Sequence, residues 1–137
     1  MTVDRSDAAR VDIIDVGVPL RPEFAALLRT VTSSVGADLG LDLDEIDDLR
    51  LAVSEVFSVL LDLAGDAGDD DAGERCRARL AVTPDAVAIT LARDVAEDVP
   101  TLDDLAVTIL STVVDEFRVS ADGIDLVKRV TAPAAPS

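Results

Sequence analysis

The stretch from residue 41 to residue 64 constrains the fold more than any other part of the chain, because its apolar residues recur over many turns at helical spacing. Intervals of three and four are typical of a helix with one core-facing side. The apolar positions are Ile46, Leu49, Ala52, Val53, Val56, Phe57, Leu60, Leu61 and Leu63. Asp44 is expected to cap the start of this helix, and Gly65 to end it. The sequence therefore predicts a long amphipathic helix that must pack on another layer.

The first half of the chain predicts one strand and one helix before this central helix. Residues 10–20 are expected to form a strand, because they include Val11, Ile13, Val16 and Val18. Two prolines, Pro19 and Pro22, end that run. Pro22 suits a first helical turn. The apolar residues that follow it continue at helical spacing as far as Gly36, which is expected to end the first helix.

The second half predicts two hairpins separated by a helix. Residues 75–82 and 86–93 are strand-like runs joined by a short turn, and residues 116–120 and 124–130 flank an Asp-Gly turn. A helical pattern spans residues 102–114. The order strand, helix, helix, hairpin, helix, hairpin predicts an α+β fold, a two-layer α/β sandwich with a mainly antiparallel sheet and helices on one face.

The chain length predicts a single domain. Residues 10–130 of the 137 are expected to form it, with a disordered N-terminus at residues 1–9 and a disordered tail at residues 131–137. With 12 basic against 28 acidic residues, the net charge of −16 repels phosphate backbones and anionic membranes, so direct nucleic-acid binding and membrane binding are not expected. No apolar run suits a membrane span or a signal peptide, and we expect a cytoplasmic protein.

The single cysteine and the absence of histidine bear on metal and redox chemistry. Cys76 has no second cysteine for a disulfide and no histidine for a zinc site or a catalytic pair. We expect it to be a buried strand residue, and we expect no metal site.

The central helix resembles the signature helix of the anti-sigma-factor serine kinases, a branch of the GHKL group of histidine kinase-like ATPases. The matching residues are Leu51, Ala52, Val53, Ser54 and Glu55, with Ala64 at the end of the pattern. The C-terminal segment VVDEFRVSADGIDLVKRV is also similar to the last strands of that group. The resemblance covers roughly residues 15 to 130 and implies the GHKL sandwich fold.

The resemblance also implies a nucleotide site, and several of its positions are changed here. Glu55 stands at the general base, but Val59 replaces the Asn that would hold magnesium, and valine offers no oxygen ligand. Asp94 stands at the adenine position. Ala96 and Asp98 stand where glycines are expected after it.

The glycine-rich stretch that would lend backbone amides to the phosphates is changed as well. It reads PTLDDLAVTIL and places Asp103 and Asp104 on the phosphate side. Because a base without its nucleotide has no task, Glu55 is interpreted as a vestigial base and Asp94 as a loop acid.

Three hypotheses follow from these changes. The chain is a pseudokinase that binds a regulatory partner, a divergent but active ATP-dependent serine kinase that phosphorylates an anti-anti-sigma partner, or an adaptor that has left sigma regulation. We expect the first, with no cofactor; ATP and magnesium belong only to the second. The resemblance implies a sigma factor or an anti-anti-sigma protein as partner and a homodimer formed through the exposed sheet face.

Overall fold

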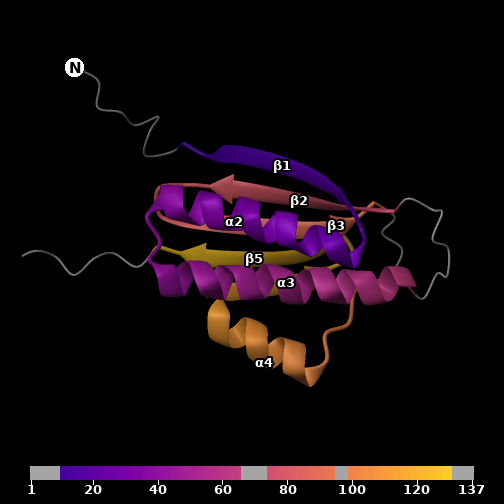
Figure 1. Cartoon of the computed structure of the whole chain (residues 1–137). Helices are drawn as coiled ribbons and strands as arrows, with labels where there is room; N and C mark the ends of the chain where they lie inside the picture. The colour runs from indigo at the N-terminus through magenta and orange to yellow at the C-terminus, as the bar shows by residue number, and fades with distance from the viewer. Residues whose placement is uncertain (1–9, 66–73, 95–98, 131–137) are drawn as a thin grey trace, which may run out of the picture.

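A computed structural model of the chain describes residues 10–65, 74–94 and 99–130 (Figure 1). The expected disordered ends, residues 1–9 and 131–137, lie outside the described residues. The elements in chain order are β1 (Asp12–Pro19), the 3-10 turn η1 (Pro22–Phe24), α2 (Ala25–Leu39), α3 (Leu43–Gly65), β2 (Arg75–Val82), β3 (Ala86–Arg93), α4 (Asp104–Val113), β4 (Glu116–Ser120) and β5 (Gly123–Arg129).

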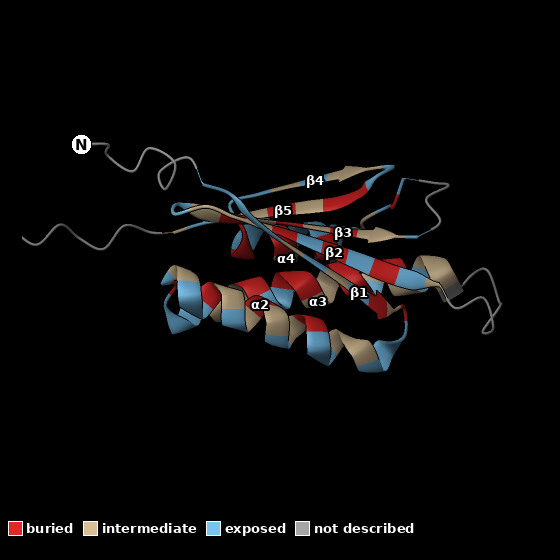
Figure 2. Cartoon of the chain, turned by 90° about the horizontal axis from the view of Figure 1, so that it is seen from above, coloured by how far each residue is buried: buried red, intermediate tan, exposed pale blue. Residues whose placement is uncertain are grey.

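The described strands form one antiparallel sheet in the order β1-β2-β3-β5-β4. Helices α2, α3 and α4 cover one face of the sheet, and no helix covers the other face in the described part of the chain (Figures 1 and 2). The predicted α+β sandwich with helices on one face is confirmed. The first hairpin has the predicted bounds, because its turn residues separate two runs of strict strand periodicity.

The core lies between α3 and the inner face of the sheet. The predicted stripe of α3 supplies Leu49, Val53, Phe57 and Leu60, each at most 2% exposed. Alternate residues of the strands meet it, as the two-residue period of a strand requires. They include Val18, Cys76, Ala78, Leu80, Val87, Ile89, Leu91, Ile124 and Leu126. None of the helices in the described ranges is long and apolar enough to cross a membrane.

Cys76 is a buried strand residue, as expected. Its side chain is 0% exposed on the inner face of β2. Burial raises the pKa of its thiol from 9.0 to about 12, with a smaller contribution from the nearby negative charge of Asp94. A thiol that stays protonated is a poor nucleophile, so Cys76 acts as a small hydrophobe.

The start of α3 differs from the prediction, because Asp42 rather than Asp44 is the cap. The Asp42 Oδ1 atom accepts a hydrogen bond from the Glu45 backbone N–H at 2.8 Å, and the Glu45 Oε1 atom accepts one from the Asp42 N–H at 2.9 Å. This reciprocal pair is a capping box. Several acidic residues lie close together at this helix start. Only Asp42 lies three residues before Glu45, which is the spacing that both hydrogen bonds require.

The first helix was expected to end at Gly36, and that expectation is wrong. Helix α2 continues to Leu39 and ends at Gly40, which has a left-handed φ of 95°. A Cβ atom on Gly36 would lie 3.2 Å from Ile46 Cγ1 and 3.3 Å from Leu41 Cδ1. Gly36 therefore lets α2 approach α3 closely, and its role is in packing rather than in helix termination.

The ammonium group of Lys128 links the sheet to the helices of the other layer. The Lys128 side chain, on the inner face of β5, is 12% exposed and lies 3.5 Å from the Asp48 carboxylate of α3. Its Nζ atom also donates to the backbone oxygen of Val113 at the end of α4, at 3.0 Å. A single partly buried ammonium group thereby joins β5, α3 and α4.

We predict that Gly123→Ala lowers the free energy of unfolding by roughly 2 to 3 kcal/mol. Gly123 has a φ of 129°, and an added Cβ would collide with the Leu91 carbonyl oxygen and lie 3.0 Å from Ala92 Cβ. Urea denaturation followed by circular dichroism measures the change. Gly17→Ala is the matched control, since its Cβ would meet only the Arg75 side chain at 3.4 Å. Equal stability of the two variants would contradict this prediction.

Candidate functional site

A pocket of about 160 Å³ lies between the C-terminal half of α3 and the N-terminus of α4. Successive turns of α3 and the segment that enters α4 form its walls. The lining residues are Glu55, Ser58, Val59, Asp62 and Leu63 from α3, Thr101 and Asp103 from the segment that precedes α4, and Ala106 from its first turn. The structure therefore brings together the predicted base, the changed magnesium position and the changed phosphate segment.

The charge of this pocket is negative. Glu55, Asp62 and Asp103 contribute carboxylates, and none of the described residues that line the pocket is basic. Two like charges about 4 Å apart repel each other by about 1 kcal/mol in water, and by several times more near a protein surface. A phosphate group placed here would meet acids on both helices, and the lining residues offer no cation to offset them.

The N-terminus of α4 is closed by its own side chain. The Asp103 Oδ1 atom accepts a hydrogen bond from the Ala106 backbone N–H at 2.7 Å. A free helix N-terminus is a ready site for a phosphate because its N–H groups point outward. Here a carboxylate already occupies part of that site. Asp103 was expected on the phosphate side, but its role as a cap was not predicted, although an Asp directly before an apolar helical run is a capping signal.

Val59 is a half-buried hydrocarbon wall of the pocket and packs against the core. Magnesium needs oxygen ligands in near-octahedral geometry, which this side chain cannot supply. Within residues 10–65, 74–94 and 99–130, no group of three or more His, Cys, Asp or Glu side chains is arranged to hold a metal ion. Val59 therefore offers no ligand at the position where the resemblance expects one, and the loss of nucleotide binding stays a prediction.

Asp94 does not join Glu55 in this pocket. It is exposed directly after β3, and its backbone N–H donates to the Arg75 carbonyl oxygen at 3.1 Å. It lines a separate depression on the sheet, together with Arg75 and Arg77. Ala96 and Asp98, the two changed glycine positions, lie outside the described residues. The roles assigned to Glu55 and Asp94 stay predictions.

An ion pair that the sequence analysis missed stands beside Asp94. Arg93, at the end of β3, makes a two-bond contact with the Glu74 carboxylate, and one of its bonds joins Nη2 to Oε1 at 3.0 Å. The two side chains are only 17% and 14% exposed. A bidentate pair of this kind fixes the start of β2 to the end of β3. Nothing in the sequence marks two charges 19 residues apart as partners.

Comparisons with known proteins agree with the resemblance of the central helix. No protein-family model matches the chain. It is 32% identical over 81 residues to the serine-protein kinase RsbW of Bacillus licheniformis and 34% identical over 64 residues to that of Bacillus pumilus. It is 43% identical over 51 residues to the anti-sigma-F factor RsbW of Mycobacterium tuberculosis.

These matches are partial on both sides. They cover 59%, 47% and 37% of this chain, and 49%, 40% and 30% of the respective relatives. The chain thus spans at most about half the length of these relatives, at an identity that indicates common descent over the aligned part. Together with the sandwich fold, these matches show that the chain is a relative of the anti-sigma-factor serine kinases of the GHKL group.

Proposed function

We propose that this chain is a regulatory protein-binding module of the anti-sigma type that neither binds nor hydrolyses ATP. The observation that carries the proposal is the pocket between α3 and α4, where three carboxylates and the hydrocarbon of Val59 stand and where Asp103 caps the helix that would bind phosphate. The names of the relatives support the regulatory half of the proposal. If the nucleotide site is lost, the function that this chain can still share with those relatives is the binding of a partner protein.

A divergent active serine kinase is the second candidate. It is favoured by one observation, that Glu55 lines the pocket in which a reaction would take place, and by relatives that are named serine-protein kinases. This candidate requires the pocket to bind magnesium and ATP despite Val59 and Asp103. Nucleotide binding therefore separates the two candidates.

The charge of the helical layer indicates the chemistry of the partner. Acidic side chains stand in the first turn of α3 and of α4, and the chain as a whole carries a net charge of −16. A partner on this layer should present a basic surface, and association should be steered by charge. We propose a sigma factor as that partner, with an anti-anti-sigma protein as the competing class and no direct contact with nucleic acid.

The outer face of the sheet is the surface that would carry a homodimer. No helix covers it in the described part of the chain (Figure 2). Its middle strand β3 presents small residues, Ala86, Ala88, Thr90 and Ala92, which are half-buried. The exposed side chains of β2 beside them are Arg75, Arg77 and Arg79. A strip of small side chains allows two sheets to approach face to face.

We predict that the purified chain gives no binding heat with magnesium and ATP up to about 1 mM, a limit that corresponds to about 4 kcal/mol of binding free energy. Repulsion from Glu55, Asp62 and Asp103 is the physical reason. Isothermal titration calorimetry is the measurement. Micromolar affinity, or nucleotide carried through purification, would refute the proposal and promote the kinase candidate.

The single variant Val59→Asn serves as the control for this prediction. It adds one oxygen ligand without removing the acids or freeing the N-terminus of α4, so it should remain without measurable binding or phosphotransfer. Its stability should fall by about 1 kcal/mol, because the amide displaces apolar contact and is only partly paired. Phosphotransfer by this variant would show a better-formed pocket than the carboxylates suggest.

We predict that affinity capture from native cell extract recovers a sigma factor at about 0.05 M salt and loses most of it at about 0.5 M salt, where charges are screened within a few ångströms. Mass spectrometry identifies the captured protein. Recovery of neither a sigma factor nor an anti-anti-sigma protein would leave the adaptor hypothesis. A complex whose stability does not depend on salt would contradict the proposal that charge steers the association, even if the captured protein is a sigma factor.

We predict that light scattering gives twice the mass of one chain, and that Ala88→Arg converts the dimer to a monomer. The substitution places a long cation in the small-residue strip of β3. Leu105→Arg is the matched control, since Leu105 is 67% exposed on α4, away from the sheet. A monomeric native chain, or a dimer that survives Ala88→Arg, would contradict this assignment of the interface.

A further inference from the structure

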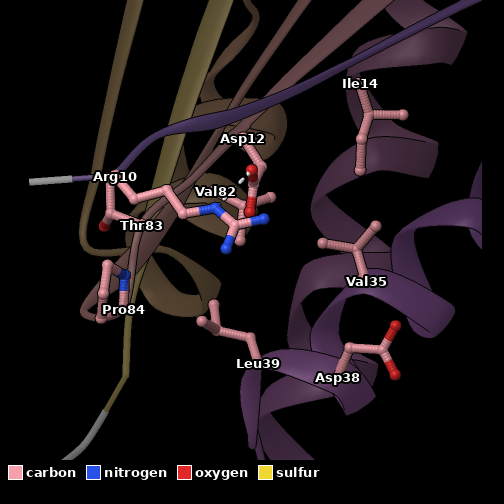
Figure 3. A pocket seen from close by; sticks show the side chains of 9 residues that line it. All are labelled: Arg10, Asp12, Ile14, Val35, Asp38, Leu39, Val82, Thr83 and Pro84. Carbon is pink, nitrogen blue, oxygen red and sulfur yellow. Dashed lines mark hydrogen bonds and ion pairs between the residues drawn. The ribbon is translucent and has the colours of Figure 1, made fainter. Parts of the chain in front are cut away.

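A second pocket, of about 450 Å³, opens between strand β1 and the C-terminal half of α2 (Figure 3). It shares no lining residue with the pocket between α3 and α4. Its position is at the other end of the sandwich, because α2 ends where α3 begins and the first pocket uses the last turns of α3. The lining residues are Arg10, Asp12, Ile14, Val35, Asp38, Leu39, Val82, Thr83 and Pro84.

The pocket exists because α2 packs on α3 rather than on β1. Gly36 allows this close approach, since a Cβ atom there would already press on Ile46 and Leu41 of the neighbouring segment. An opening of this size is within the range of pockets that bind ligands.

The floor of the pocket is aliphatic and its rim is charged. Ile14, Val35 and Leu39 are half-buried, and in Figure 3 the side chains of Val35 and Leu39 point into the opening. On one side of the rim, the Arg10 Nε atom lies 2.9 Å from the Asp12 Oδ1 atom. On the other side stands Asp38, which is exposed and has no ion-pair partner within the described residues.

The strand beside the pocket has one free edge. In the described sheet β1 pairs with β2 alone, so the backbone groups on its other side have no strand neighbour. Val11 and Ile13 are each 51% exposed at the same end of the strand. A free edge with exposed aliphatic side chains is a template for the addition of another strand.

We propose that the cleft between β1 and α2 is a docking site for an extended, basic segment of a partner protein that adds to the free edge of β1. One aliphatic side chain of this segment rests on Ile14, Val35 and Leu39, and a lysine or arginine beside it faces Asp38. Main-chain hydrogen bonds give the affinity, and the pocket with its Asp38 carboxylate gives the specificity.

A basic partner fits better than a second copy of this chain. A second copy would bring its own net charge of −16 to the rim that carries Asp38. A purely apolar ligand would leave that carboxylate unused. The inference shares with the proposed function the premise of a partner protein, but it holds whether or not the pocket between α3 and α4 binds nucleotide.

The test uses a short synthetic peptide of alternating lysine and valine with one terminal tryptophan. The protein has no tryptophan or tyrosine, so the fluorescence of the probe reports binding directly. We expect saturable binding to the full chain, and slower hydrogen exchange of the backbone amides of β1 in the complex. Leu39→Glu should weaken binding by about tenfold or more through loss of the apolar seat. Asp38→Lys should weaken it by roughly fivefold through charge reversal.

Three controls decide between this site and general attraction to an acidic protein. Leu105→Glu adds the same charge as Leu39→Glu on the exposed side of α4 and should leave binding unchanged. A peptide with N-methylated valines cannot pair with a strand edge and should not bind. A glutamate and valine peptide should bind poorly to the native chain and better to Asp38→Lys.

Each alternative result overturns the proposal. Equal binding by native protein and Leu39→Glu would mean attraction by net charge, and protection confined to α3 and α4 would place the peptide elsewhere. Absence of binding, or peptide-free association of β1 edges between two copies, would also reject it. None of these results bears on the calorimetric test of nucleotide binding, so the two proposals fail separately.

Discussion

The burial of one side of α3 against the inner face of the sheet is the interaction on which the rest of the structure depends. Val56 and Phe57 of α3 and Val87, Leu91 and Ile124 of the sheet are at most 1% exposed. Burial of an aliphatic or aromatic side chain contributes about 1.5 to 3 kcal/mol, so this seam outweighs any single polar contact in the molecule. Helices α2 and α4 find their places by packing on the flanks of α3.

This arrangement also fixes what the polar side of α3 can do. Residues of α3 that turn away from the sheet face α2, α4 or solvent, and Glu55 and Val59 lie on the side of the start of α4. The fold thus brings Glu55, Val59 and Asp103 to one pocket, and we infer that the chemistry of its lining, rather than the fold, decides whether a nucleotide can bind. A hydrocarbon stands at the metal position and a carboxylate caps the helix terminus, and both changes disfavour a magnesium triphosphate.

Periodicity predicted much of the fold, because it reports which side of each element is buried. The stripe of α3, the bounds of β2 and β3, and the layer arrangement follow from it. Periodicity does not say which of two neighbouring residues of the same type caps or ends a helix. Asp42 and Asp44 are equally good caps in isolation, and only the bond with Glu45 distinguishes them. Gly36 and Gly40 are equally good terminators, and only contact with α3 assigns Gly36 to packing.

The candidate site was predicted in part. Local patterns brought Glu55 and Val59 together, since four residues on a helix make one turn. The ion pair of Arg93 with Glu74 and the separation of Asp94 from the pocket depend on how distant segments meet, which one sequence does not record. The cleft beside β1 is of the same kind, because its walls come from β1, α2 and the turn between β2 and β3, which lie far apart in the sequence.

We propose above that the pocket between α3 and α4 no longer binds a nucleotide. A crystal structure grown with excess magnesium and a non-hydrolysable ATP analogue tests it most directly. We expect that the Asp103 carboxylate still accepts a hydrogen bond from the Ala106 N–H and that no triphosphate density lies between Glu55 and α4. Density for a magnesium triphosphate in that pocket, with the Asp103 side chain displaced from the helix N-terminus, would contradict it.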